Sequence, residues 1–253
     1  MKKSVIHQLN KLNTEFYQKV AVPFSNSRSY YWQGWNKLVP YVQELTKERD
    51  RVRILDIGCG NGRLGLFLRE QIPQEYIQYI GVDNSEELIT KAKEQYEPHR
   101  MEPTFITLDL VESLLKDELV EKLSEYRAHF ISVLGVLHHI PSFELRQKLI
   151  SDLGSLVVRD GYLAFTTWNF MESEKLIKKI VPPTTVGVDP EELDPHDVIL
   201  DWQRGLTAYR YCHYTDRMER ELLIKNSGLE FKSEFTADGK VGTLNTYVVL
   251  QKT

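Results

Sequence analysis

The chain has 253 residues, of which 42% are hydrophobic and 27% charged, and its formal net charge at pH 7 is -4. This length suits one α/β domain with additions or two small domains, with enough apolar residues for a large core. The mild negative charge does not favour a dedicated nucleic-acid binder, which is usually basic overall or on one face, but it still allows a local basic surface.

Membrane and secretory features are not expected. The chain has no apolar run near the ~20 residues that a membrane helix needs, and it opens with Met-Lys-Lys and no apolar stretch. The two cysteines, Cys59 and Cys212, lack the spacing of a metal site. We therefore expect a cytoplasmic protein with no membrane partner and no metal ligands.

The first 50 residues predict a helix followed by an aromatic segment. Leu9, Phe16 and Val20 recur at helical spacing, so we expect a helix over residues 1–24 that Pro23 ends. Residues 24–35 then combine serines, tyrosines and tryptophans with Arg28. These aromatic residues either pack on the domain as a loop or form a flap over one end of the sheet, where rings stack and an arginine pairs with an anion. A further helix is expected to begin at residue 38.

Residues 51–63 predict a strand, a glycine loop and the start of a helix. The apolar run from Val52 to Ile57 reads as a buried parallel strand, and Gly58, Gly60 and Gly62 follow it. A ligand can approach such glycines closely because they have no Cβ. A strand that leads through a glycine loop into a helix N-terminus suits a nucleotide-like ligand.

The spacing of the loop points away from a dinucleotide. The third glycine comes one residue earlier than in G-x-G-x-x-G, and Arg63 stands where that pattern has glycine. Asp56 at the strand end would repel a pyrophosphate but attract an ammonium group. The loop resembles motif I, D-x-G-x-G-x-G, of the class I S-adenosylmethionine-dependent methyltransferases. The alternative is a glycine-rich turn in an ordinary α/β domain.

The resemblance extends to the next strands and implies S-adenosylmethionine as the cofactor. Asp83 ends an expected strand over residues 77–83, where an acid binds ribose hydroxyls in that family, or merely caps the helix that Ser85 begins. Asp109 ends the strand that starts at Thr104, where the family has a contact to adenine. The cofactor-binding residues expected on this basis are Asp56, Gly58, Cys59, Gly60, Gly62, Asp83, Asn84, Asp109, Leu110 and Leu134.

The fourth strand is expected to leave the sheet at the sequence Val-Leu-His-His-Ile. His138 and His139 allow three interpretations: metal ligands, a general base, or residues that pack the strand exit. Because adjacent side chains point to different sides of a strand, we expect no shared metal. A fifth strand follows the turn at Asp160, where the family has glycine.

Residues 166–214 are expected to be an insertion that recognises the substrate. Arg210 and His213 alternate there with aromatic residues, which suits an anionic group on a ring; the alternative is an exposed edge strand. Thr215 is expected to cap a last helix that ends at Gly228, before two closing strands.

Strands and helices alternate through the middle of the chain, which predicts a parallel sheet covered on both faces. The resemblance implies an α/β, Rossmann-like, doubly wound sheet of seven mostly parallel strands with an antiparallel last strand. We expect one domain over residues 1–253: a helical and aromatic flap (1–50), a cofactor-binding core (51–165), the insertion (166–214), and a closing helix and strands (215–253).

Two short patches resemble a narrower group, the tRNA wobble-uridine carboxymethyl methyltransferases. The group's pattern Y-x-x-x-A-x-x-F-S-x-x-R is matched by Tyr17, Ala21, Phe24, Ser25 and Arg28. Its R-Y-Y-H pattern is matched at residues 210–213, except for Cys212. The resemblance implies methyl esterification of a 5-carboxymethyl uridine in tRNA, often with a small zinc-binding activator subunit.

Three interpretations follow. The first is this tRNA methyltransferase, with Arg28, Arg210 and His213 on the acceptor side. The second is a small-molecule methyltransferase of the same fold, which the acidic charge favours. The third is a non-catalytic cofactor-binding partner protein. A missing catalytic dyad excludes none of them, because alignment of an activated methyl donor with its acceptor supplies most of the rate.

Overall fold

The central element of the computed structural model, which describes residues 1–26, 30–99, 102–203 and 207–253, is a seven-stranded sheet. Its order is β3-β2-β1-β4-β5-β10-β9. The strands are β1 (Val52–Ile57), β2 (Ile77–Asp83), β3 (Thr104–Thr107), β4 (Ala128–Val133), β5 (Val157–Trp168), β9 (Glu230–Ala237) and β10 (Asn245–Gln251). The first five pair in parallel, whereas β10 runs antiparallel to both neighbours. The predicted doubly wound fold is therefore confirmed, including its antiparallel last strand.

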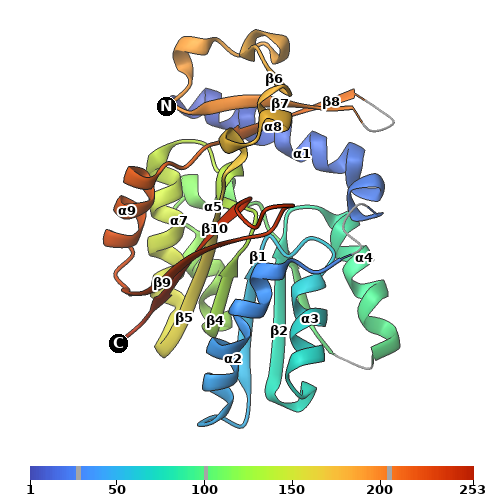
Figure 1. Ribbon diagram of the computed structural model, residues 1–253, viewed down its shortest axis with the longest axis vertical. Helices are drawn as coiled ribbons and strands as arrows, with labels where there is room; N and C mark the ends of the chain where they lie inside the picture. Colours follow the sequence, from blue (N-terminus) through green and yellow to red (C-terminus); the bar gives the residue numbers. More distant parts are fainter. Residues whose placement is uncertain (27–29, 100–101, 204–206) are drawn as a thin grey trace.

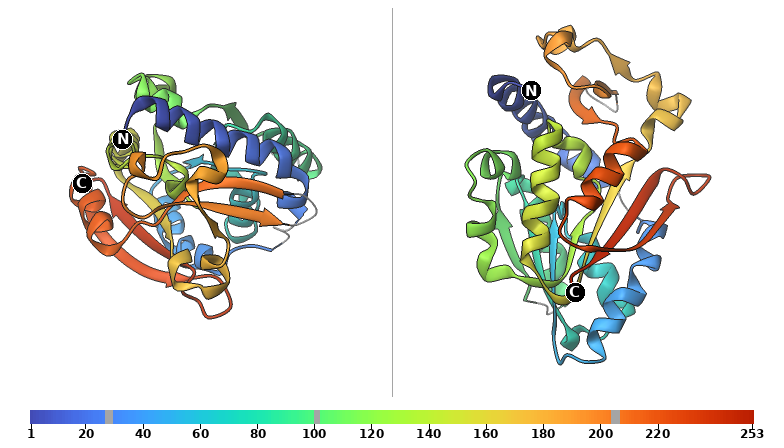
Figure 2. Two further views of the ribbon diagram at one scale, coloured as in Figure 1. Left: turned by 90° about the horizontal axis from the view of Figure 1, so that it is seen from above. Right: turned by 90° about the vertical axis from the view of Figure 1, so that its left-hand side faces the viewer.

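Helices cover both faces of this sheet (Figures 1 and 2). One face packs against α5 (Leu110–Leu115), α6 (Leu119–Leu123), α7 (Phe143–Leu156) and α9 (Arg217–Lys225). The other packs against α2 (Val39–Thr46), α3 (Arg63–Gln71) and the end of α4 (Glu86–Tyr96). The inner strands are apolar on both sides because both of their faces are buried in this way.

A second layer lies across one end of the sheet (Figure 1). It consists of α1 (Lys3–Asn26) and a three-stranded antiparallel sheet of β6 (Ile180–Val181), β7 (Asp197–Gln203) and β8 (Thr207–His213). We call these elements the cap. The apolar face of α1 packs on the small sheet, with Leu9 against Ile199 and Phe16 against Trp202. A short helix, α8 (Glu174–Ile177), connects β5 to the cap.

Several predicted boundaries were wrong. The spacing of Leu114, Leu115, Leu119 and Leu123 predicts one helix over residues 111–126, but the structure splits it into α5 and α6, and Asp117 adopts a positive φ of 58° between them. Asp216, not Thr215, caps α9, because its side chain accepts a hydrogen bond from the Glu219 amide at 2.8 Å. The first helix continues past Pro23 to Asn26. None of the described helices has the length and apolar character needed to span a membrane.

Candidate active site

A cavity of about 690 Å³ opens where the carboxyl ends of β1, β2, β3 and β4 meet the cap. Parallel α/β sheets generally bind ligands at this edge. The cavity wall combines the glycine loop, the strand ends, α1, residues of the aromatic segment and Arg210 of β8. Figure 1 shows α1 and the cap sheet lying over this end of the central sheet. The predicted site residues from distant parts of the sequence can therefore meet here.

The glycine loop bends over the end of β2. The amides of Gly58 and Cys59 both donate to the Val82 carbonyl, at 2.7 and 3.0 Å. Gly58 has a φ of 68°, and a Cβ at this position would overlap the side chain of Val136. Gly58, Cys59 and Gly60, which the sequence suggests as cofactor-binding residues, line the cavity. Gly62 does not line it: it begins α3 with a φ of 76° and lies against Tyr96.

Asp56 lies beneath the loop and is not among the residues that line the cavity. Its carboxylate accepts hydrogen bonds from Tyr79 Oη at 2.6 Å and Ser132 Oγ at 2.7 Å. Burial raises the pKa of Asp56 to about 6, although the two hydroxyl donors act in the opposite direction. The predicted direct contact with an ammonium group is therefore not what this geometry supports. Asp56 instead supports the loop from below.

Asp83 contacts both the glycine loop and Ser85, the residue that caps α4. One carboxylate oxygen accepts from the Gly60 amide at 2.8 Å, and the other accepts from the Ser85 amide at 2.9 Å. The residue also lines the cavity, as does Asn84. Burial raises the pKa of the Asp83 carboxyl, against the lowering effect of these backbone donors. Asp83 therefore joins the glycine loop to the residue that caps α4, at the wall of the cavity.

Asp109 connects the cavity wall at the end of β3 to α1. It caps α5 by accepting a hydrogen bond from the Glu112 amide at 3.0 Å, and it accepts a second one from Asn10 Nδ2 at 2.8 Å. Asp109, Leu110 and Leu134, which the resemblance suggests as cofactor-binding residues, all line the cavity. Asn10 gave no signal in the sequence, because a polar residue on an amphipathic helix is ordinarily solvent-facing.

Arg210 lies at the cap side of the cavity between two aromatic rings. Its guanidinium carbon is 5.2 Å from the centroid of Phe16 and 5.0 Å from that of Trp168. These contacts orient a cation that lines the cavity. The other arginine predicted at the acceptor, Arg28, lies outside the described residues.

His139 is held by hydrogen bonds on both sides of its ring. Nε2 lies 2.7 Å from Tyr17 Oη, and Nδ1 lies 3.1 Å from the Tyr211 carbonyl oxygen. The Tyr211 carbonyl lies closer to Nδ1 than Asn13 Nδ2 does, at 3.4 Å, and a carbonyl accepts only, so we place the proton on Nδ1, and Tyr17 donates to Nε2. Both Tyr17 and His139 line the cavity.

The expectation that His138 and His139 point apart was wrong. Their ring centroids are 4.1 Å apart, because the two residues lie on a 3-10 turn (Leu137–His139) and not on a strand. One possible ligand atom from each ring and the sulfur of Cys212 fall within 4.8 Å of one another. Burial raises the pKa of the Cys212 thiol to about 11, and both nitrogens of His139 face protein groups. We assign no metal to this cluster.

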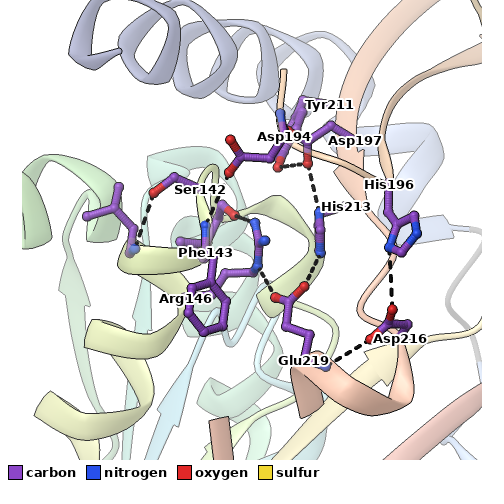
Figure 3. A network of polar contacts seen from close by, with 12 residues as sticks. Ser142, Phe143, Arg146, Asp194, His196, Asp197, Tyr211, His213, Asp216 and Glu219 are labelled. Carbon is purple, nitrogen blue, oxygen red and sulfur yellow. Dashed lines mark hydrogen bonds and ion pairs between the residues drawn. The ribbon is translucent and has the colours of Figure 1, made fainter. Parts of the chain in front are cut away.

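His213 is not among the cavity-lining residues, contrary to its predicted place at the acceptor. It is buried, and its two ring nitrogens contact the carboxylates of Asp197 and Glu219, each at 2.7 Å (Figure 3). The alternation of residues 210–213 explains the error: along a strand, odd and even positions face opposite sides, so Arg210 and His213 point apart.

Several cavity residues were not predicted as site residues. They include Asn10, Asn13, Arg63, Val136, Asp238 and Asn245. Arg63 donates to the Tyr30 carbonyl at 2.6 Å and Asp238 accepts from the Gly34 amide at 3.0 Å, so both hold the aromatic segment against the cavity. The sequence of residues 237–240 predicts a turn at Asp238, and Arg63 is a departure from the dinucleotide pattern, but neither signal predicts these contacts.

Residues 28–234 match the methyltransferase domain family. The chain belongs to this family. The predicted enzyme class, a methyltransferase, is thereby confirmed, and the non-catalytic interpretation is not retained. The names of the relatives below do not test the tRNA subgroup, which stays a prediction.

Curated relatives of this methyltransferase carry two different names. A carboxy-S-adenosyl-L-methionine synthase of Helicobacter pylori is 25% identical over 91% of this chain and 83% of its own length. A ubiquinone biosynthesis O-methyltransferase of Vibrio atlanticus is 29% identical, over 57% of this chain and 59% of its own length.

Solved structures share the fold of this methyltransferase. A S-adenosylmethionine-dependent methyltransferase from Clostridium acetobutylicum superposes with a TM-score of 0.62 at 13% identity, over 93% of this chain and 98% of that one. CalS10, a SAM-bound amino pentose methyltransferase from Micromonospora echinaspora, has a TM-score of 0.56 at 11% identity, over 92% and 97% of the two chains.

Proposed function

We propose that this methyltransferase transfers the methyl group of S-adenosylmethionine to a carboxylate that adjoins a planar ring. The observation that carries the proposal is the position of Arg210, a cation on the cavity wall between Phe16 and Trp168. A guanidinium binds a carboxylate with two parallel hydrogen bonds, and the neighbouring aromatic faces suit a flat ring.

The donor end of the cavity fits S-adenosylmethionine. Gly58 and Gly60 have positive φ and present no side chain to a ligand, while Asp83 and Asp109 place carboxylates where hydroxyl and amino groups can be bound. Two solved neighbours are named as complexes with S-adenosylmethionine or S-adenosyl-L-homocysteine, which supports the same donor here. The bound donor supplies a sulfonium methyl group that is already activated for transfer.

The protein's own contribution is to bind and align the acceptor. A carboxylate is ionised at neutral pH and requires no general base. Arg210 would hold one edge of the carboxylate so that a free oxygen faces the donor end of the cavity. Trp168 and His138, whose ring centroids lie 5.0 Å apart, would exclude water beside it. Proximity and orientation then account for most of the rate.

The acceptor that we propose is a 5-carboxymethyl uridine at the wobble position of tRNA. Its support is that Tyr17 and Arg210, which belong to the two patches that resemble the wobble-uridine enzymes, line one cavity although 193 positions separate them. A small zinc-binding activator subunit is part of this proposal.

A free aromatic acid is the second candidate acceptor. The net charge of -4 favours it over a nucleic acid, and so does the position of α1 and the cap sheet over the strand ends. A small molecule needs no broad basic surface to be recognised.

Labelled S-adenosylmethionine separates the two acceptors. The protein is incubated with bulk tRNA lacking wobble methyl esters, with and without an activator, and in parallel with a pool of small aromatic acids. Label in RNA that mild alkali releases supports the tRNA ester, whereas label confined to small acids overturns it. A donor that gains a carboxyl group in mass spectrometry, the activity named for the Helicobacter pylori relative, would contradict methyl transfer altogether.

Arg210→Met tests the acceptor role. We expect kcat/KM for the acceptor to fall about 100-fold, since an ion pair with a buried partner is lost. Calorimetric affinity for S-adenosyl-L-homocysteine should change by less than about twofold. Arg220→Met is the matched control, because Arg220 pairs with Glu234 at 2.9 Å and does not line the cavity. An equal loss of donor affinity in Arg210→Met would refute the assignment.

A further inference from the structure

A buried ion network connects the cap to the central domain (Figure 3). We use this name for Arg146, Asp197, Tyr211, His213 and Glu219. Their side chains come from α7, from β7 and β8 of the cap, and from α9. The side chains of Arg146, His213 and Asp197 are at most 2% exposed, and that of Glu219 is 14% exposed.

His213 stands at the middle of the network. Its Nδ1 lies 2.7 Å from Asp197 Oδ1, which also accepts a hydrogen bond from Tyr211 Oη at 2.7 Å. Its Nε2 lies 2.7 Å from Glu219 Oε2. Both carboxylates accept hydrogen bonds when ionised, so both ring nitrogens must carry protons to satisfy them. The geometry therefore fits the imidazolium form.

Glu219 joins two walls of the cavity. Through His213 it holds the end of β8, the strand that carries Arg210. Its other oxygen accepts from Arg146 Nε at 2.6 Å, and Arg146 Nη1 donates to the Ile140 carbonyl at 3.0 Å. Ile140 directly follows the turn with His138 and His139. One buried carboxylate thus holds both the strand of Arg210 and the histidine turn.

The charges in the network balance while His213 is protonated. Arg146 and His213 are then opposed by Asp197 and Glu219. The titratable groups around them are Tyr211, whose hydroxyl donates to Asp197, His196, whose ring centroid lies 6.5 Å from that of His213, and the carboxylates of Asp194 and Asp216. Burial lowers the pKa of His213, but its hydrogen bonds to Asp197 and Glu219 outweigh that effect and the net pKa is raised. Loss of the proton would leave an uncompensated buried carboxylate, which is costly.

We propose that His213 is a positioning residue for the acceptor: as an imidazolium it fixes β8 against α9, and loss of its charge releases the strand that carries Arg210. The part that concerns Arg210 and the acceptor rests on the proposed function, whereas the mechanical link does not. Because the link needs the protonated form, it is present below the raised pKa of His213 in the folded protein and is lost as the pH rises through that pKa.

Hydrogen exchange measured by mass spectrometry tests the link without any acceptor. Amides of residues 207–213 and 137–140 are followed from about pH 6 to about pH 10, corrected for intrinsic exchange. We expect the wild-type protein to lose protection in both segments by about tenfold as the pH rises. His213→Gln, which has no charge, should show the reduced protection at every pH. Persistence of the wild-type pH dependence in His213→Gln would overturn the proposal.

His196→Gln is the matched control. His196 is exposed and lies 3.8 Å from Asp216. The substitution therefore removes a nearby titratable ring that is not part of the network. It should behave as the wild-type protein does. If His213→Gln does not fold, Glu219→Gln can be used instead, because it keeps the size of the Glu219 side chain and removes its charge. We expect the same loss of protection in both segments. Unchanged protection in that variant would equally overturn the proposal.

Kinetics separate this inference from the proposed function. With whichever acceptor becomes labelled, His213→Gln should raise the KM for the acceptor about tenfold or more and leave the affinity for S-adenosyl-L-homocysteine within about twofold. Labelling of neither acceptor would defeat the proposed function and leave the exchange result intact. Transfer with unaltered KM in His213→Gln would defeat only the positioning role.

Discussion

The hydroxyl of Tyr79 donates a 2.6 Å hydrogen bond to Asp56 in the interior of the protein, directly beneath the glycine loop. Tyr79 belongs to β2 and Asp56 to β1, two neighbouring parallel strands in which Asp56 pairs with Gly81. The acid that the sequence suggested as a ligand contact is therefore part of the sheet that supports the loop. The ionisation of Asp56 should therefore affect the free energy of unfolding.

Asp56 should make stability depend on pH. Burial raises its pKa in the folded protein from 3.8 to about 6, so the folded state binds the proton more tightly than the unfolded state. Its stabilising contribution is thus fully present below the unfolded value and is lost as pH rises through about 6. The change amounts to roughly 2–3 kcal/mol of unfolding free energy. Asp56→Asn should flatten this dependence in urea unfolding between about pH 4 and pH 7.

Tyr79→Phe is the companion variant for that prediction. It removes one donor to Asp56 without changing the titrating group, so the unfolding free energy should fall by about 1–3 kcal/mol at neutral pH, where the carboxyl is charged. The pH dependence should remain. A flat profile in Tyr79→Phe, or an unchanged slope in Asp56→Asn, would contradict the assignment of the slope to Asp56.

The first two loop glycines should differ in their tolerance of a methyl group. Both have positive φ, but a Cβ on Gly58 would overlap Val136, whereas a Cβ on Gly60 meets no atom within 4 Å. Gly58→Ala should lower the unfolding free energy by about 2–4 kcal/mol and abolish measurable donor binding. Gly60→Ala should lower the unfolding free energy by only about 1 kcal/mol. Thermal unfolding of the two variants decides this, and equal losses would argue against the described loop.

Asp83→Asn should lower the affinity for the methyl donor more than it lowers the stability of the fold. The amide oxygen of asparagine can accept the hydrogen bond from Gly60 or the one from Ser85, but not both. The substitution also removes the charge of a carboxylate that lines the cavity. We expect affinity for S-adenosyl-L-homocysteine to fall about 10- to 100-fold in calorimetry. Glu87→Gln, in the exposed first turn of α4, is the charge-matched control and should bind S-adenosyl-L-homocysteine as the wild-type protein does.

Tyr17→Phe should affect turnover through His139. It removes the 2.7 Å hydrogen bond that Tyr17 makes to Nε2, so the His139 imidazole on the cavity wall is held less firmly. We expect kcat to fall about tenfold and the unfolding free energy by about 1 kcal/mol. Tyr41→Phe removes an equivalent hydroxyl, 2.8 Å from Ser233 Oγ and away from the cavity. Its kcat should not change.

Local sequence patterns were sufficient to predict the strands of the central sheet. Continuous apolar runs at β1, β2 and β4 predicted buried parallel strands, because both of their faces meet helices. The glycine loop and the acids at strand ends predicted the donor end, because parallel strands bring their carboxyl ends to one edge of the sheet. Gly58, Asp83 and Asp109 line the cavity for that reason.

The sequence by itself therefore determined the fold class and the enzyme family, and it pointed to the cavity residues at the strand ends, because all of these depend on short-range periodicity and spacing. Only the tertiary structure decided which residues meet across the chain: Asn10 with Asp109, Tyr17 with His139, and His213 with Glu219. These pairs depend on how the cap docks on the sheet. Docking is a packing of surfaces far apart in sequence, and no local pattern records which polar group of one surface faces which group of the other.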